Sequence, residues 1–272
     1  MPASGTFGRL LDLFRLSRMP AAGDHYSNFG GTTNPRLGLI YHLSRPTTLK
    51  LLYGTAFRAP EPFEIEPDYG PFYDDNLKLK PETIRSVEGV VEQAVGQHFT
   101  VSGSVFRNWI DNLISLETNP ADGQSVYQNS GQVIATGVEI ELDGRLVSGL
   151  QGRASYSYTD TMQPVTNQTL ANSPKQLGKL DLIVPLLQQR LFASLDAQYT
   201  SPVQTLAGNT VSGFSVFNVT LLGHTLGKHL DLSGSIYNIL NKKYFDPGRP
   251  EDVQDEIQQD GRNFRVKLTA RF

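Results

Sequence analysis

The chain contains no cysteine among its 272 residues. This absence excludes disulfide frameworks, thiolate zinc sites and cysteine nucleophiles. Long apolar runs are also missing, because no stretch approaches the about 20 residues that a membrane-spanning helix needs. Strands of a membrane barrel alternate apolar and polar residues, so they remain compatible with this composition. The net charge of −3 gives no electrostatic reason to expect nucleic acid as a partner.

The N-terminus also lacks the uninterrupted apolar region of a secretory signal peptide. Residues 7–16 carry three charged side chains, those of Arg9, Asp12 and Arg15, among apolar ones. We therefore predict no signal peptide in this chain. Residues 1–23 are expected to form a separate segment that is either disordered or a short amphipathic helix.

What the sequence does contain is alternation, most clearly in its last ten residues. The side chains of Phe264, Val266, Leu268, Ala270 and Phe272 share one face, and polar side chains occupy the other. At about 3.3 Å per residue and a tilt near 45°, such a strand rises about 23 Å, close to the ~25 Å apolar band of an outer-membrane barrel. A strand in a soluble sandwich alternates in the same way but has typically only about 5–6 residues.

From residue 34 onward the sequence divides into about eleven alternating segments. They cover residues 36–42, 48–57, 82–94, 98–116, 133–146, 150–159, 175–184, 190–200, 213–222, 229–239 and 263–272. Short and long connections alternate between them, as in bacterial outer-membrane barrels. The predicted fold class is all-β: an antiparallel up-and-down meander of about eleven long strands, equivalent to a partial (half) transmembrane β-barrel.

Several stretches resemble one family in order along the chain. They are residues 33–38 (TNPRLG), 53–60 (YGTAFRAP), 77–82 (LKLKPE), 127–131 with 136–139, 172–174, 237–248 (YNILNKKYFDPG) and 259–272. Residues 24–272 thereby resemble the C-terminal half of the β-barrel of a TonB-dependent outer-membrane receptor. That family imports ferric siderophores, cobalamin and similar scarce solutes.

The resemblance implies several partners. They are outer-membrane lipid, the barrel-assembly machinery and, in a complete receptor only, TonB. A complete member also carries a signal peptide, a plug and about 22 strands. We therefore expect a fragment whose further partners are the missing N-terminal plug and barrel half. It would lie in the outer membrane of a Gram-negative-type cell if exported, and it would not transport solute alone.

The loop at residues 58–81 is the main candidate site. Its ligand candidates are Glu61, Glu64, Asp68, Tyr69, Phe72, Tyr73, Asp74 and Asp75. Carboxylates there can bind a cation or a basic group and aromatic rings can stack on a flat ligand, whereas the alternative is a solvated surface loop.

By resemblance, Arg58 is the candidate for a lumen-facing functional residue. The strand polar faces also carry Arg153, Arg265, Lys267 and Arg271 toward a lumen. The terminal residues Phe264, Val266, Leu268, Ala270 and Phe272 resemble the signal read by the barrel-assembly machinery.

Two other classes of function are possible on the sequence. One is a small passive outer-membrane pore, which the odd number of expected strands disfavours because antiparallel closure needs an even one. The other is an outer-membrane enzyme, which the lack of a nucleophile–base set disfavours. His224 and His229 flank a short turn without an evident third ligand, so we predict neither a metal site nor a cofactor.

Overall fold

The computed structural model describes residues 14–26, 30–66, 73–187, 190–226, 229–249 and 252–270. The strands of the main path are β1 (Phe14–Tyr26), β2 (Gly30–Ser44), β3 (Thr47–Arg58), β5 (Glu82–Val95), β6 (Phe99–Asp111), β9 (Gln132–Arg145), β10 (Gln151–Gln163), β12 (Gln176–Leu186), β13 (Leu191–Thr200), β16 (Phe214–Leu226), β17 (Leu230–Tyr237) and β20 (Asn263–Ala270). Shorter elements in the connections are α2 (Pro62–Ile65), β4 (Tyr73–Asp74), β7 (Ile114–Thr118), β8 (Ser125–Asn129), β11 (Gln168–Thr169), β14 (Val203–Gln204), β15 (Thr210–Val211), β18 (Phe245–Pro247) and β19 (Glu256–Gln258).

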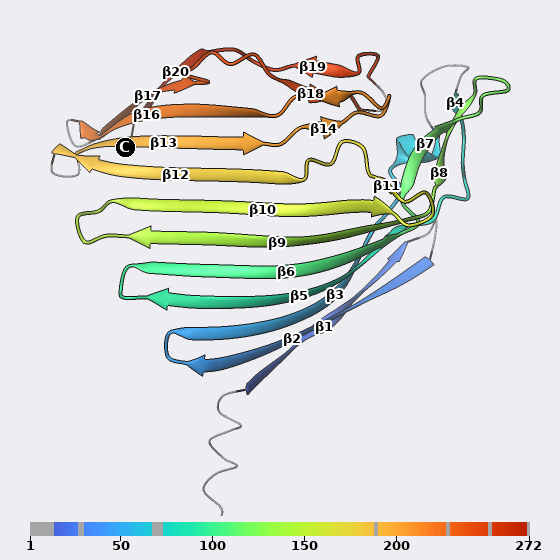
Figure 1. Ribbon diagram of the computed structural model, residues 1–272, viewed down its shortest axis with the longest axis horizontal. Coiled ribbons are helices and arrows are strands. Elements are labelled where there is room, and N and C mark those ends of the chain that lie inside the picture. The colour runs from blue at the N-terminus through green and yellow to red at the C-terminus, as the bar shows by residue number, and fades with distance from the viewer. Residues whose placement is uncertain are drawn as a thin grey trace, which may run out of the picture. The chain divides into compact units, whose positions relative to one another are not determined.

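The main sheet confirms the predicted meander. Its spatial order is β1-β2-β3-β5-β6-β9-β10-β12-β13-β16-β17-β20, with β11 paired to β10 beside this path. The order therefore follows the chain, as the colours of Figure 1 show. β1 and β20 end the order and do not pair with each other, so the sheet is not closed within the described residues.

Strand β1 corrects the expectation for the N-terminal segment. Residues 14–23 were expected to be disordered or helical, but they belong to an antiparallel strand in which Phe14 lies opposite Tyr41. The helical interpretation assumed a period of about 3.6 residues, whereas Phe14 and Leu16 alternate with charged and polar residues as in a strand. Residues 1–13 lie outside the described part of the chain. With β1 the path has twelve strands, so the objection to closure from an odd strand count was wrong.

A second difference concerns the segment expected over residues 98–116. It divides into β6 and β7, and the break includes Asn112, whose φ of 58° is left-handed. Asparagine tolerates this conformation better than most residues do. The break allows β7 to leave the main sheet and join a small one in the order β4-β8-β7.

The apolar face of the main sheet is exposed. Leu51, Val105, Ile140, Leu221 and Val266, from five strands, are each between 50% and 77% exposed. A soluble sheet normally buries one face against another layer. Exposed aliphatic side chains at alternate positions are instead typical of a lipid-facing surface.

Buried apolar residues gather in the connections instead. Leu79, Ile114 and Tyr127 form a small core, with Ile65 and Leu116 packed against it. Among the described residues, burial of these apolar side chains therefore stabilises the folded conformation of the β3–β5 and β6–β9 connections.

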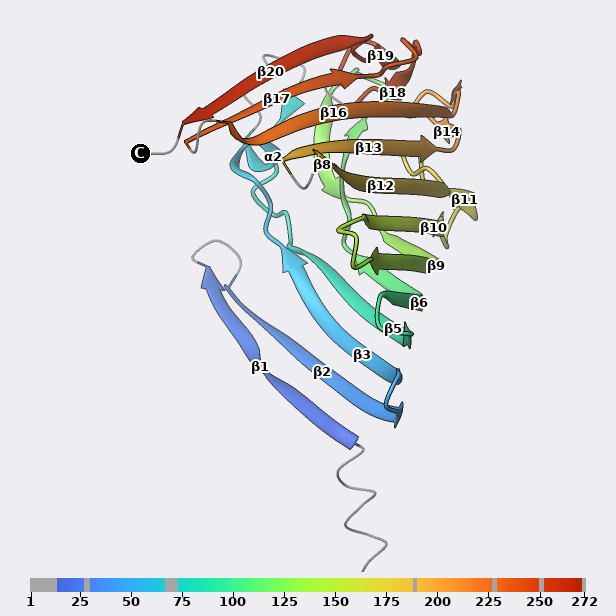
Figure 2. The same cartoon turned by 90° about the vertical axis from the view of Figure 1, so that its left-hand side faces the viewer.

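The connections alternate in length along the meander. Turns of two or three residues join β2 to β3 and β5 to β6, whereas the connections β3–β5, β6–β9 and β17–β20 contain secondary structure of their own. Figure 1 shows β14, β18 and β19 beyond one end of β13, β16 and β17, and Figure 2 shows β13, β16, β17 and β20 following one another in the sheet. Because neighbouring strands are antiparallel, successive connections fall at opposite ends of the sheet.

The chain divides into two compact units. Unit 1 comprises residues Met1–Val91, Val105–Gly137 and Asp160–Leu170, and unit 2 comprises Glu92–Ser104, Val138–Thr159 and Ala171–Phe272. Helix α2 and the β4-β8-β7 sheet belong to unit 1, whereas the β14–β15 and β18–β19 hairpins belong to unit 2. In the described residues, none of the helical structure is long and apolar enough to cross a membrane.

Candidate functional site

Arg58, the predicted lumen candidate, is the centre of an ion-pair network in unit 1. Its Nε donates to Glu82 Oε2 at 2.7 Å and its Nη2 donates to Glu82 Oε1 at 2.8 Å. Its Nη1 lies 3.0 Å from both carboxylate oxygens of Glu64. Glu82 Oε1 also accepts the backbone N–H of Ile114 at 2.8 Å. The network therefore links the ends of β3 and β5 to α2 and β7.

Helix α2 forms because its first residues cap it locally. Pro62 stands at the start of the helix, where its missing N–H is not needed. The Glu64 carboxylate accepts the backbone N–H of Glu61 at 2.8 Å, as in a capping box. Glu64 is buried. Its carboxylate is thus engaged by Arg58 and by the helix start, so we assign it a structural role.

Among the described residues, the other predicted ligand candidates of this loop form no cluster of three or more carboxylates able to hold a metal. Glu61, Asp74 and Asp75 are exposed. Asp68, Tyr69 and Phe72 lie outside the described residues, and only the backbone of Tyr73 is described.

Two asparagines that were not predicted as site residues hold the described part of this loop. Asn129 Oδ1 accepts the Lys80 N–H at 2.9 Å, and its Nδ2 donates to the carbonyls of Lys80 and Asn112. Asn76 Nδ2 donates to the Tyr127 carbonyl at 2.8 Å, and Phe63 packs edge-on against the Tyr127 ring with centroids 6.0 Å apart. The sequence did point to both residues, because Asn76 lies beside the family-like stretch LKLKPE and Asn129 lies within the family-like stretch YQNSG. These hydrogen bonds therefore tie the described part of the loop to β8, while many of its side chains, among them Leu77 and Lys78, remain exposed.

The single tryptophan of the sequence also lies in unit 1. The Arg107 guanidinium is 5.4 Å from the centre of the Trp109 ring, in cation–π geometry. Both residues belong to β6, close to its loop end.

A cavity of about 590 Å³ lies in unit 2 where the strands meet their long connections, and we call it the loop-end pocket. Its lining includes Tyr237, Tyr244, Asp246, Gln259 and Asp260. Its volume is within the range of about 300–1,000 Å³ that small-molecule sites occupy. These pocket residues were not predicted from the sequence, although Tyr244 and Asp246 belong to the matching stretch YNILNKKYFDPG.

The walls of the loop-end pocket are held by hydrogen bonds at the end of β17. Asn238 adopts a left-handed φ of 48° and exchanges side-chain hydrogen bonds with the backbone of Lys242. Its own N–H donates to Asn218 Oδ1 at 2.9 Å. The ring of Tyr244 then packs on Phe214 with centroids 4.4 Å apart. Burial, followed by the nearby carboxylates of Asp246 and Asp260, raises the pKa of Tyr244.

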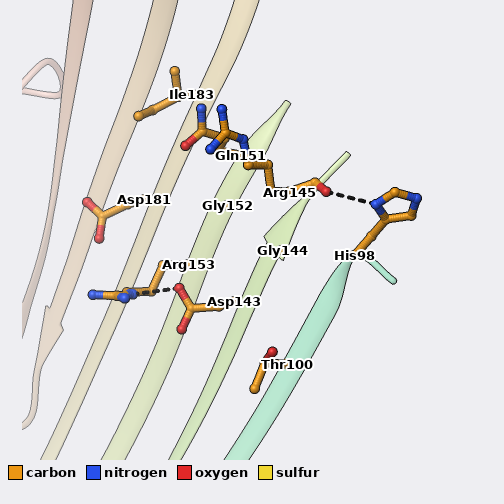
Figure 3. Close-up of a pocket in the computed structure, with 10 residues that line it drawn as sticks. All are labelled: His98, Thr100, Asp143, Gly144, Arg145, Gln151, Gly152, Arg153, Asp181 and Ile183. Carbon is orange, nitrogen blue, oxygen red and sulfur yellow. Dashed lines mark hydrogen bonds and ion pairs between the residues drawn. The ribbon is translucent and has the colours of Figure 1, made fainter. Parts of the chain in front are cut away.

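A second cavity of unit 2, of about 420 Å³, is lined by charged residues of β9, β10 and β12 near the short turns. Figure 3 shows Arg153 directed at Asp143, with Nε 2.8 Å from Oδ1, and Asp181 on the neighbouring strand. Arg153 Nε is also 3.7 Å from Glu141. The predicted lumen residue Arg153 is therefore already paired.

The remaining predicted residues lie on β20. Phe264, Val266 and Leu268 are exposed on one face, as expected, and Arg265 and Lys267 alternate with them. Ala270 ends the strand, while Arg271 and Phe272 lie outside the described residues. The described residues contain no group of three or more histidines or carboxylates able to hold a metal.

Comparison with known proteins places this geometry among bacterial receptors. A sequence profile described as TonB dependent receptor-like, beta-barrel, matches residues 14–239. The ferric enterobactin receptor of Pseudomonas aeruginosa is 24% identical over 294 residues, which cover 92% of this chain and 39% of that protein. The iron-regulated outer membrane virulence protein of Vibrio cholerae is 27% identical over 198 residues, covering 70% and 30% respectively.

Solved structures agree on the fold. The ferric enterobactin receptor of Pseudomonas aeruginosa superposes with a TM-score of 0.77 at 21% identity, covering 97% of this chain and 43% of the other. The copper transporter OprC gives 0.69 at 19% identity, covering 89% and 40%. The chain thus spans less than half the length of these relatives.

Proposed function

The chain belongs to the TonB-dependent receptor β-barrel family, and we propose that it forms the C-terminal part of a receptor for the energised uptake of a ferric siderophore or a similarly scarce solute. The observation that carries this proposal is the meander, whose aliphatic face is exposed and whose β3–β5 and β6–β9 connections share a small apolar core. The named ferric receptors among its relatives support the class of solute.

This family consists of receptors and transporters rather than enzymes, which agrees with the prediction that the chain is not an enzyme. We propose the outer membrane as its location, with lipid against the exposed aliphatic face. The N-terminal plug and barrel strands of a complete receptor, the barrel-assembly machinery and TonB are the proposed protein partners. Since the chain alone spans less than half of its relatives, we propose that it does not transport solute by itself.

A chimera tests the uptake proposal. Residues 14–272 replace the corresponding C-terminal part of the Pseudomonas aeruginosa ferric enterobactin receptor, and the chimera is expressed in an iron-starved strain without its own ferric siderophore receptors. We expect growth on at least one ferric siderophore and loss of that growth when TonB is deleted. A chimera that is present in the outer membrane but supports no growth on any ferric complex contradicts the proposal.

A passive pore is a second candidate, favoured by one observation. The twelve strands of the main path are an even number, which permits antiparallel closure. Conductance in planar bilayers separates the two functions: a uniform, TonB-independent channel formed by the chain alone supports the pore, whereas its absence supports the receptor fragment.

A further inference from the structure

The loop-end pocket carries acidic groups without basic ones. Asp246 belongs to β18 and Asp260 follows β19, and both carboxylates are exposed. The described residues that line the pocket include no lysine, arginine or histidine. The ion pairs found in the described part of the chain involve other carboxylates, those of Glu64, Glu82, Asp111, Glu141 and Asp143.

The aromatic residues of the loop-end pocket, like its carboxylates, favour a positively charged ligand. Tyr237, Tyr244 and Phe214 all line it, and Tyr244 is tilted by 39° on Phe214. Aromatic faces attract cations and repel anions because of the ring quadrupole. The raised pKa of Tyr244 agrees with a negative potential, since Asp246 and Asp260 contribute to it after burial.

The polar groups between these charges are neutral. Gln198, Thr200 and Asn263 supply amide and hydroxyl groups along the strand side of the pocket. Such groups can donate to the carbonyl or hydroxamate oxygens of a ligand without adding charge. The pocket therefore combines hydrogen-bonding capacity with net negative charge, which distinguishes it from the Arg153 cavity, where a cation is already paired.

We propose that the loop-end pocket recognises a positively charged group of the solute, such as a protonated amine carried by a ferric tris-hydroxamate. The proposal rests on the uptake function above and specifies its substrate class. Three hydroxamates neutralise ferric iron, so one ammonium makes the complex a monocation. Three catecholates give a trianion, which the Asp246 and Asp260 carboxylates disfavour.

Equilibrium dialysis of the full chain in detergent micelles tests this preference with radioiron-labelled complexes. The probes are a ferric tris-hydroxamate with a free amine, the same complex with the amine acetylated, and a ferric tris-catecholate. We expect the free-amine complex to bind about fivefold more tightly than its acetylated form, the effect of one well-placed exposed ion pair. The catecholate is expected to bind most weakly. Equal binding of the two hydroxamates, or binding of neither, overturns the proposal.

Substitutions test whether the carboxylates of the loop-end pocket cause the preference for the free amine. Asp246→Asn with Asp260→Asn should remove the preference for the free amine, whereas Glu256→Gln, the same type of change on β19 outside the pocket lining, should retain it. Asp260→Lys should reverse the order, so that the catecholate gains affinity. Retention of the amine preference in the double variant contradicts the assignment. Circular dichroism and proteolysis patterns verify that each variant keeps the fold.

The uptake function and the charge preference of the loop-end pocket can be disproved independently of each other. If the chimera imports a ferric complex but the chain does not distinguish the amine from its acetylated form, the charge assignment is wrong and the uptake function stands. If the chain prefers the amine but no ferric complex supports growth of the chimera strain, the charge assignment stands and the uptake function fails.

Discussion

Arg58 is the residue whose removal should disturb unit 1 most. In an Arg58→Ala variant, Glu82 and the buried Glu64 lose their shared cation, and their side chains are only 12% and 8% exposed. Leaving buried acceptors unpaired costs about 1–3 kcal/mol, and the 40% exposure of Arg58 keeps the cost below that of a fully buried pair. Urea unfolding of the chain in micelles measures this loss.

Arg85 provides the matched control, because it pairs with Asp111 at 3.1 Å on a more exposed part of unit 1. Arg85→Ala should change stability by no more than about 1 kcal/mol. Arg58→Lys should fall between the two, since lysine keeps the charge but not the two parallel hydrogen bonds to Glu82. Equal losses for Arg58→Ala and Arg85→Ala would exclude the network as the anchor of the loop.

Asp255 should make part of unit 2 sensitive to acid. Hydrogen bonds from Thr205 and then Asn209, whose Nδ2 is 2.9 Å from Oδ2, lower the pKa of Asp255. A carboxyl whose folded pKa is depressed stabilises the fold above its unfolded value, and that contribution is lost as the pH falls through the folded pKa. The advantage of the chain over an Asp255→Asn variant should therefore shrink as the pH falls from about 5 to below the ordinary aspartate pKa of about 3.9.

Urea unfolding of both proteins across that range measures the difference. Asp252→Asn, a nearby carboxylate that accepts the Arg249 N–H at 2.8 Å, serves as the control for a general charge effect. If the difference in free energy of unfolding between the chain and the Asp255→Asn variant does not vary with pH, Asp255 is not the source of the acid sensitivity.

At the scale of elements, β20 offers a test of the lipid-facing surface. Val266 is 77% exposed and lies near the middle of the strand. An arginine at the lipid face costs about 2–4 kcal/mol at the bilayer midplane. Val266→Arg should therefore reduce stability in phospholipid vesicles by up to this amount.

The opposite face of β20 supplies the comparison. Thr269 lies opposite Asp231, so Thr269→Arg places the same side chain beside a carboxylate. We expect this variant to insert into vesicles like the unaltered chain. If both variants lose stability equally, the two faces of β20 do not differ in their surroundings, and the assignment of the apolar face to lipid is wrong.

The elements differ in how far the sequence predicts them. The main strands follow from alternation, since one face meets apolar and the other polar surroundings. β1 was misassigned because Phe14 shares a helical face with Phe7, Leu10 and Leu11, whereas its alternation with Leu16 is only a short run. β7 was merged with β6 because nothing in the pattern marks the left-handed turn at Asn112.

The candidate site was less predictable for a different reason. Arg58 and Glu82 are 24 positions apart, and their pairing depends on β3 and β5 being neighbours with a loop that returns between them. Tyr244, Asp246 and Asp260 share a pocket only because the β18–β19 hairpin folds the connection back. Alternation specifies the face of each strand, but not which connections meet beyond its end.

At the scale of the whole molecule, the two ends of the strand order predict association. β1 and β20 each have one neighbour in the described sheet. Unpaired edges carry free N–H and C=O groups that pair readily with other strands. Sedimentation velocity of the chain in micelles should therefore show concentration-dependent assembly, whereas a monodisperse monomer over a hundredfold range of concentration would contradict it.

The position of Trp109 has a spectroscopic consequence. It is the only tryptophan in the chain, it lies on β6 beside Arg107, and it does not line the loop-end pocket. Intrinsic emission excited in the tryptophan band therefore reports on one strand of unit 1. A shift of its emission maximum would indicate changes around β6, so occupancy of the loop-end pocket calls for a second fluorophore, for instance through Phe214→Trp.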